Sequence, residues 1–214
     1  MGLRDHLAAD EVERFERLHG SEVGRRWLVS RGALREILAA ELGVSPASVK
    51  LQLGEHGRPR LKPGTHPSEI DFNLSHSGEL ALVAVGRGRR VGIDVERLRP
   101  GRNPLRVADR FFSPAEVSAV KAVMPDEQPQ EFLRYWTAKE ALAKGVGQGL
   151  RVERDELELA QSTDRSLAPL RADGWNLIEI SDLPEGYFGS LAVEGAPARV
   201  AMREWVPDEG KAVG

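Results

Sequence analysis

The segment Arg134–Gly145, RYWTAKEALAKG, has the composition of a helix and combines a tryptophan with several charged side chains. Trp136, Glu140 and Lys144 follow one another at intervals of four residues. Because an α-helix repeats every 3.6 residues, this spacing places the three side chains on one face. Two interpretations are open: Glu140 and Lys144 form an ordinary ion pair on the surface while Trp136 joins the core, or all three line a functional site.

The composition is that of an ordinary globular protein. The 214 residues, 41% of them hydrophobic, are enough for a buried core and for one or two domains. A net charge of −3 gives no indication of nucleic-acid binding, and the absence of cysteine excludes disulfides and thiolate zinc sites. No apolar run reaches the roughly 18 residues of a membrane helix, and the N-terminus lacks the apolar core of a signal peptide. We therefore expect a cytoplasmic protein with no nucleic-acid or membrane partner.

Helix signals precede strand signals in each half of the chain. In the first half we predict a helix from Ser21 to Gly43 and strands at 49–53, 70–75, 80–85 and 90–96, the last three joined by hairpin-like links. In the second half we predict a helix capped by Ser113, a helix at 129–144 that stops at Gly145, and strands at 175–180, 187–193 and 199–206. The sequence therefore predicts an α+β fold of two similar subdomains, 1–100 and 101–214.

The strand VGIDVE carries two carboxylates. Asp94 and Glu96 are two residues apart and therefore share one face, while the alternate apolar side chains turn to the core. Like charges at this separation repel unless a cation or strong donors lie between them, and Mg²⁺ takes one or two carboxylates together with water and phosphate oxygens. The alternative is a solvated acidic face. Glu140 would add a third carboxylate if its helix packs beside this strand.

The segment FNLSHSG offers phosphate ligands at the end of another strand. Hydroxyl groups and an imidazole, those of Ser75, His76 and Ser77, are suited to bind phosphate, although a simple turn is the alternative. Ser75 and His76 are adjacent in a strand and point to opposite faces, which argues against a nucleophilic pair. Basic residues in GRPRLK, beginning with Arg58, and on the helix at 21–42 add positive charge. Together with the carboxylates, these groups suggest a polyphosphate ligand bridged by a metal, in a chain without a P-loop.

Five motifs, in chain order, resemble one family: GRP, FNLSHSG, VGIDVE, FFSPAE and WTAKEALAKGVGQGL. They are similar to those of the 4′-phosphopantetheinyl transferases of the surfactin-synthetase-activating (Sfp-like) type, over residues 10–205. Members move the phosphopantetheine arm of coenzyme A onto a serine of an acyl or peptidyl carrier protein and leave adenosine 3′,5′-bisphosphate. The resemblance implies a monomer in which two α+β halves are related by a pseudo-twofold axis, with coenzyme A bound between them.

The resemblance also implies roles for individual residues. Asp94, Glu96 and Glu140 correspond to the Mg²⁺-binding carboxylates, and Glu140 is also the general base toward the acceptor serine. Lys144 corresponds to the lysine that contacts the diphosphate and assists the leaving group. The positions that correspond to other coenzyme A contacts are Arg26, Arg58, Ser75, His76 and Lys139. Some relatives grip the 3′-phosphate with two lysines on the first helix, where this chain has only arginines.

Two other classes of function remain open. The acidic cluster could serve a metal-dependent phosphohydrolase that uses water as the nucleophile on a nucleotide-like diphosphate. The chain could also be a non-catalytic module that only binds coenzyme A, although a binding module has no need of a base at Glu140.

Overall fold

The computed structural model describes residues 2–54, 57–66, 69–99, 101, 104–147, 157–172, 174–197 and 199–206. Its internal contacts define two compact units: Met1–Gln52 with Pro59–Ser68 and Arg199–Gly214, and Leu53–Arg58 with Glu69–Ala198. The second unit therefore combines segments from both sides of the boundary that we predicted near residue 100. The pseudo-twofold relation of 1–100 and 101–214 stays a prediction. Within the described ranges, no helix is long and apolar enough to cross a membrane.

The first unit is mainly helical. Its elements are η1 (Leu3–His6), α1 (Ala9–Leu18), α2 (Glu22–Leu42), η2 (Pro46–Ser48), most of β1 (Leu51–Leu53), and β2 (Pro59–Leu61), which pairs with β1. Helix α2 begins and ends where the sequence predicts. The hydroxyl of Ser21 accepts a hydrogen bond from the amide of Gly24, and Gly43 closes the helix with a φ of 67°.

The first unit also corrects two sequence-based expectations. The predicted strand at 199–206 is wrong, because this segment forms no strand. Its Trp205 instead donates a hydrogen bond from Nε1 to Glu36 on α2, at 2.9 Å. The positive charge expected on α2 is partly neutralised, since Arg31 and Arg35 both form ion pairs with the buried Glu11.

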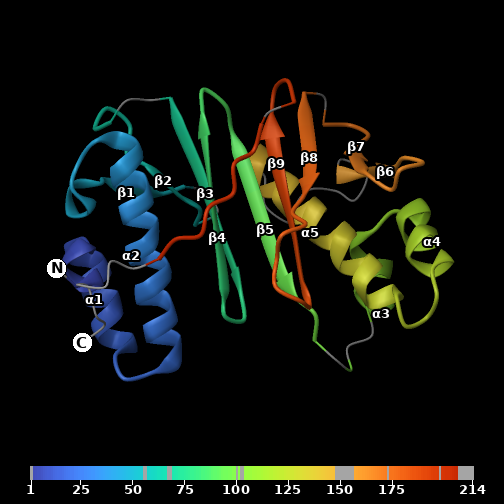
Figure 1. Ribbon diagram of the computed structural model, residues 1–214, viewed down its shortest axis with the longest axis horizontal. Helices are drawn as coiled ribbons and strands as arrows, with labels where there is room; N and C mark the ends of the chain where they lie inside the picture. Colours follow the sequence, from blue (N-terminus) through green and yellow to red (C-terminus); the bar gives the residue numbers. More distant parts are fainter. Residues whose placement is uncertain are drawn as a thin grey trace. The chain divides into compact units, whose positions relative to one another are not determined.

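The described part of the second unit contains three antiparallel sheets (Figure 1). One is a hairpin of β3 (Ile70–Ser77) and β4 (Leu80–Arg87). Another has the order β5-β9-β8, with β5 at Val91–Arg97, β9 at Tyr187–Glu194 and β8 at Trp175–Glu179. In the third, two short strands, β6 (Leu159–Gln161) and β7 (Leu167–Pro169), pair with each other.

Polar side chains of β3 take the place of a backbone ladder between β3 and β5, which lie side by side in different sheets. Every second residue of β3 accepts the amide of a residue of β5. The four hydrogen bonds are Val91 to Asp71 (2.9 Å), Ile93 to Asn73 (2.8 Å), Val95 to Ser75 (3.4 Å) and Arg97 to Ser77 (3.1 Å). The predicted β4–β5 hairpin is therefore wrong, because β5 pairs its backbone with β9 and meets β3 through side chains.

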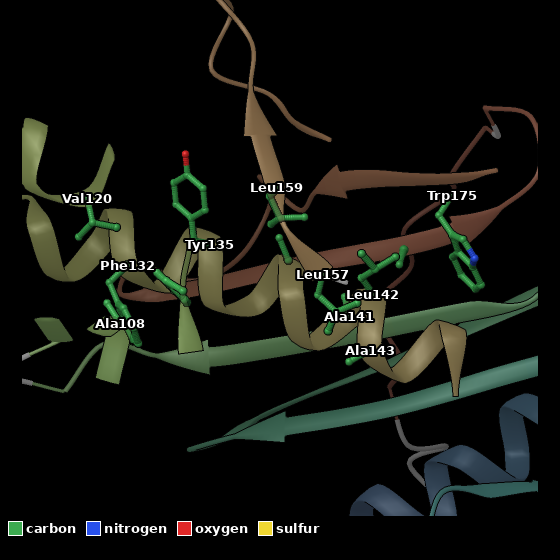
Figure 2. Close-up of a cluster of buried hydrophobic side chains, with 13 residues drawn as sticks. Ala108, Val120, Phe132, Tyr135, Ala141, Leu142, Ala143, Leu157, Leu159 and Trp175 are labelled. Carbon is green, nitrogen blue, oxygen red and sulfur yellow. The ribbon is translucent and has the colours of Figure 1, made fainter. Parts of the chain in front are cut away.

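Helix α5 (Gln128–Val146) packs against β5, β8 and β9, with α3 (Pro104–Phe111) and α4 (Pro114–Ala122) packed against α5. Figure 2 shows the core between these elements, in which Tyr135, Leu142 and Trp175 are buried together. As predicted, Ser113 caps α4 in a reciprocal capping box with Glu116.

Two glycines allow α5 to lie directly on β5. A Cβ atom at Gly92 would stand 2.0 Å from the carbonyl oxygen of Ala141 and 2.4 Å from the amide nitrogen of Gly145, so no side chain fits there. The helix continues through Gly145, contrary to the predicted stop, and ends at Val146, where Gly147 caps it with a φ of 86°. This close packing brings the last two turns of α5 alongside the carboxylates of β5.

Candidate active site

A pocket of about 390 Å³ opens in the second unit, between side chains of β3, β5 and α5. Its lining residues are Leu74, Ser75, His76, Asp94, Glu96, Trp136, Glu140 and Lys144. The column of Trp136, Glu140 and Lys144 thus faces one pocket, as the helical spacing predicts, and both carboxylates of β5 face it too. The structure brings together six of the nine predicted site residues: Ser75, His76, Asp94, Glu96, Glu140 and Lys144.

Trp136 forms the aromatic wall of the pocket. Its ring lies edge-on to Phe111 of α3, with 5.6 Å between centroids, and stacks against Phe132 one turn earlier on α5, at 5.7 Å. The contact with Phe111, which belongs to another helix, restricts the rotation of α5 about its own axis. Glu140 and Lys144, one and two turns further along, are held toward β5 as a result.

The ammonium group of Lys144 lies against Asp94. The distance from Nζ to Oδ1 is 2.6 Å, and Nζ also donates to the hydroxyl of Ser75 (3.1 Å) and the carbonyl of Ile93 (3.2 Å). Burial raises the pKa of Asp94, and the charge of Lys144 opposes that increase. The interpretation of Lys144 as the surface partner of Glu140 is therefore replaced by an ion pair between α5 and β5.

Glu140 has the most strongly shifted carboxyl of the pocket. Burial is the main cause, and the negative charge of Asp94 adds to it, so that the pKa of Glu140 rises to about 7. A carboxyl with that pKa can accept a proton near neutral pH and release it again, which is the property required of a general base.

The donor atoms of the pocket fit a hard divalent cation. Oδ2 of Asp94 and Oε1 of Glu140 are buried and have no hydrogen-bond partner among the described residues. An acceptor oxygen left in this state costs free energy unless a donor or a cation reaches it. No three acidic, histidine or cysteine side chains of the described ranges already enclose an ion-sized space. Mg²⁺ does not need three protein ligands, because it commonly takes one or two carboxylates together with phosphate oxygens.

The residues of the SHS segment alternate in exposure. Ser75 and Ser77 are buried and His76 is exposed. The hydroxyl of Ser75 donates to Oδ1 of Asp94 at 2.8 Å, and that of Ser77 donates to Oε2 of Glu96 at 2.7 Å. Ser75 therefore supports a carboxylate in this structure, whereas His76 has its imidazole available at the edge of the pocket.

Lys139 does not line the pocket. Its buried ammonium contacts both carboxylate oxygens of Glu116 at 2.9 Å and the carbonyl oxygen of Leu157, also at 2.9 Å. Lys139 thus ties α5 to α4 and to the segment that precedes β6. The phosphate contact that the resemblance implies for Lys139 stays a prediction. The capping motif FFSPAE predicts the local role of Glu116, but nothing in it predicts a partner 23 residues away.

Arg58 and Arg26 are also not pocket residues. The guanidinium of Arg58 bonds to the carboxylate of Asp71 and to the backbone carbonyls of Phe72, Val91 and Lys144, so it joins β3, β5 and α5. Arg26 belongs to the first unit, where it is exposed and pairs with Glu22 at a distance of 2.5 Å.

Comparisons with known proteins agree on one family. The model of the 4′-phosphopantetheinyl transferase superfamily matches residues 90–190, and that of the N-terminal part of 4′-phosphopantetheinyl transferases matches residues 3–87. The 4′-phosphopantetheinyl transferase HetI of Nostoc is 41% identical over 81% of this chain and 73% of its own length. The 4′-phosphopantetheinyl transferase Sfp of Bacillus subtilis is 28% identical over 82% of this chain and 72% of its own.

Among solved structures, a holo-(acyl-carrier-protein) synthase from Bacillus anthracis in complex with coenzyme A (3′,5′-ADP) matches with a TM-score of 0.40 and 17% identity. The match covers 50% of this chain and 96% of that one. On the identity and coverage of its sequence relatives, the chain belongs to the 4′-phosphopantetheinyl transferase superfamily, with the transferase Sfp of Bacillus subtilis among its relatives.

Proposed function

We propose that this transferase moves the 4′-phosphopantetheine arm of coenzyme A to a serine of an acyl or peptidyl carrier protein, in a Mg²⁺-dependent reaction that releases adenosine 3′,5′-bisphosphate. The observation that carries the proposal is the pocket that unites Asp94, Glu96 and Glu140 with Lys144 and His76. The set combines carboxylates suited to a metal with an ammonium group and an imidazole suited to phosphate. The proposal includes the monomeric state that the resemblance implies.

Coenzyme A would place its diphosphate against Lys144 and His76. Lys144 is only partly exposed, with 28% of its side-chain surface accessible, so its charge acts in a medium less polarisable than bulk water. His76 is exposed and can reach a phosphate group without rearrangement of β3. Arg26 and Arg58 remain candidates for other phosphates of coenzyme A, Arg58 only if it gives up some of its present hydrogen bonds.

The transfer forms one bond and breaks another at the β-phosphorus. The serine oxygen of the carrier protein forms a bond to this phosphorus, and its proton passes to Glu140. The bond between the β-phosphorus and the bridging oxygen breaks, and that oxygen leaves with the α-phosphate as part of adenosine 3′,5′-bisphosphate. Lys144 stabilises the negative charge that develops on the leaving group.

The carboxylates of β5 and α5 would hold the divalent cation. Bound there, Mg²⁺ would neutralise charge on the diphosphate and help an oxygen nucleophile to approach. The protein's own contribution is to present Oδ2 of Asp94 and Oε1 of Glu140, both without other partners among the described residues, next to Glu96. The contact of Trp136 with Phe111 and the glycine contact between α5 and β5 keep these oxygens in place.

Mass spectrometry of a carrier protein tests the proposal. An apo carrier protein incubated with the enzyme, coenzyme A and Mg²⁺ should gain the mass of one phosphopantetheine on a serine. A parallel reaction without carrier protein separates the transferase from a phosphohydrolase, because only a hydrolase releases adenosine bisphosphate there at a comparable rate. An unmodified carrier together with that release would overturn the proposal.

A further inference from the structure

Ser77 makes two hydrogen bonds that join the acidic strand to its neighbour. Its hydroxyl donates to Oε2 of Glu96 at 2.7 Å and accepts the backbone amide of Arg97 at 3.1 Å. The side chain is buried, so water does not compete freely for either contact. Ser75 repeats the arrangement two residues earlier, with Asp94 as its acceptor and Val95 as its donor.

The two bonds of Ser77 determine the direction of its hydroxyl proton. A hydroxyl group has one proton to donate and two lone pairs that accept. Since the amide of Arg97 approaches the lone pairs, the proton turns toward Glu96. Glu96 is only half-buried and has three rotatable side-chain bonds, so this contact selects one orientation among several. One carboxylate oxygen is held by the protein, and the other is left for the pocket.

The preceding position of the same ladder lacks this feature. Asn73 also accepts an amide of β5, that of Ile93, at 2.8 Å, but the residue before Ile93 is Gly92, which has no side chain to orient. The hydrogen bond of Asn73 therefore joins β3 to β5 without orienting a carboxylate. The serines occur at the two positions where the neighbouring residue of β5 is a carboxylate, and this coincidence separates their role from that of the rest of the ladder.

We propose that Ser77 is a positioning residue for Glu96, and that Ser75 has the same role for Asp94. By holding one oxygen of each carboxylate, the serines keep two mutually repelling groups pointed into the pocket and preorganised for a divalent cation. Groups behind metal ligands commonly change metal affinity or activity by about 10–100-fold when removed. The metal site itself rests on the proposed function, whereas the serine–carboxylate contacts do not.

Binding of Mn²⁺ tests the role of Ser77 without recourse to turnover. The probe is Mn²⁺, titrated by electron paramagnetic resonance into the enzyme saturated with coenzyme A, with a matched blank of coenzyme A alone. We expect Ser77→Ala to raise the dissociation constant of Mn²⁺ by about tenfold or more. Ser77→Thr retains the hydroxyl and should stay within about threefold of the unchanged enzyme, a shift small beside that of a lost positioning group.

Asn73→Ala is the matched control, since it also removes an acceptor for a β5 amide. It should lower the thermal denaturation midpoint at least as much as Ser77→Ala and leave Mn²⁺ affinity nearly unchanged. Equal affinity in Ser77→Ala and the unchanged enzyme would overturn the proposal, and so would an equal loss of affinity in Asn73→Ala. The unchanged enzyme is titrated before any variant. If it binds no Mn²⁺, the result contradicts the metal site of the proposed function, and this outcome is distinct from a failure of the role proposed for Ser77.

Discussion

Helix α5 carries two lysines, Lys139 and Lys144, that meet carboxylates in opposite ways. They are five positions apart, which corresponds to a rotation of about 140° around the helix axis, so the two side chains leave the helix in different directions. Lys139 enters the core and meets Glu116. Lys144 enters the pocket and meets Asp94.

The two ion pairs differ in what is left unsatisfied. The carboxylate of Glu116 accepts both contacts from Lys139 and the backbone amides of Ser113 and Leu159. Around Lys144, by contrast, Oδ2 of Asp94 and Oε1 of the neighbouring Glu140 have no partner in the described part of the chain. A buried charge pair therefore does not by itself indicate an active site. A better indication is a buried acceptor oxygen that the fold positions but does not pair with a donor, so that a ligand or a cation can bind to it.

Among changes in the pocket, Glu140→Gln should reduce turnover the most. The amide keeps the size of the side chain but removes the charge and the proton acceptor. Because general-base assistance is typically worth about 10²–10⁴ in rate, saturated turnover should fall by that factor, while coenzyme A still binds. Steady-state transfer to a carrier protein, with coenzyme A affinity measured by calorimetry, checks both parts. Turnover close to that of the unchanged enzyme would reduce Glu140 to a structural residue.

Among changes in the core, Lys139→Met should reduce the stability of the fold the most. It leaves Glu116 buried without its counter-charge, which typically lowers the free energy of unfolding by about 3–5 kcal/mol. Denaturant unfolding measures the loss. The same substitution at Lys144 is the control. It should cost less stability, because the carboxylate left behind, Asp94, lines the open pocket and keeps the hydrogen bond from Ser75.

The double variant Lys139→Met with Glu116→Gln sharpens this result. It removes both charges together and retains a side-chain oxygen that can accept a backbone amide, so part of the lost stability should return if the isolated charge is the cause. A Lys139→Met protein as stable as the unchanged one would show that the buried pair is not needed, and it would remove the contrast between the two lysines.

His76→Ala extends the comparison to an exposed imidazole of the pocket. Loss of a charge-assisted hydrogen bond costs about 1.5–3 kcal/mol, so the dissociation constant of coenzyme A should rise by about ten- to a hundredfold. Stability should hardly change, because the imidazole is exposed. A smaller effect with dephospho-coenzyme A would assign His76 to the 3′-phosphate, and an equal effect with both ligands would assign it to the diphosphate. No effect with either would remove His76 from the site.

The smallest expected effect is a pH dependence of stability in the metal-free protein, caused by Glu140. Because the fold raises the pKa of Glu140 from 4.5 to about 7, the folded state favours the protonated carboxyl. The stability that this group contributes is complete below pH 4.5 and is lost as the pH rises toward 7. Asp94, Glu96 and Lys144 face Glu140 and are unchanged in Glu140→Gln, so the difference between the two proteins isolates it.

Denaturation midpoints in chelator, measured on both sides of this pH interval, check the expectation. The Glu140→Gln variant should gain stability relative to the unchanged protein as the pH rises. A difference that does not depend on pH would contradict the environment described for Glu140.

Local features were predictable from the sequence, and long-range partners were not. The caps at Ser21 and Ser113 depend on neighbouring residues, and the column of α5 depends only on helical periodicity. The capture of Lys139 by Glu116 depends on how α4 and α5 pack, which no spacing within the motif WTAKEALAK reveals. The predicted strand at 199–206 failed for the same reason, since alternation indicates a strand only where a neighbouring strand is present to pair with it.

The ladder between β3 and β5 lies between these cases. The sequence shows short polar residues at every second position of β3, namely at 71, 73, 75 and 77. The positions between them hold Phe72, Leu74 and His76. This pattern could have indicated one polar face on β3. That this face meets the amides of β5 could not be predicted, because the sequence suggested that β4 would pair with β5.

Transfer by Asp94→Ala, followed across a Mg²⁺ titration, tests most directly whether the carboxylate pocket drives the reaction. Circular dichroism of the same sample establishes that the variant is folded. We predict that the unchanged enzyme adds one phosphopantetheine to the carrier protein in a Mg²⁺-dependent manner and that folded Asp94→Ala adds none. A folded Asp94→Ala enzyme that modifies the carrier at a near-normal rate and at ordinary Mg²⁺ concentrations would contradict the assignment of this pocket as the active site.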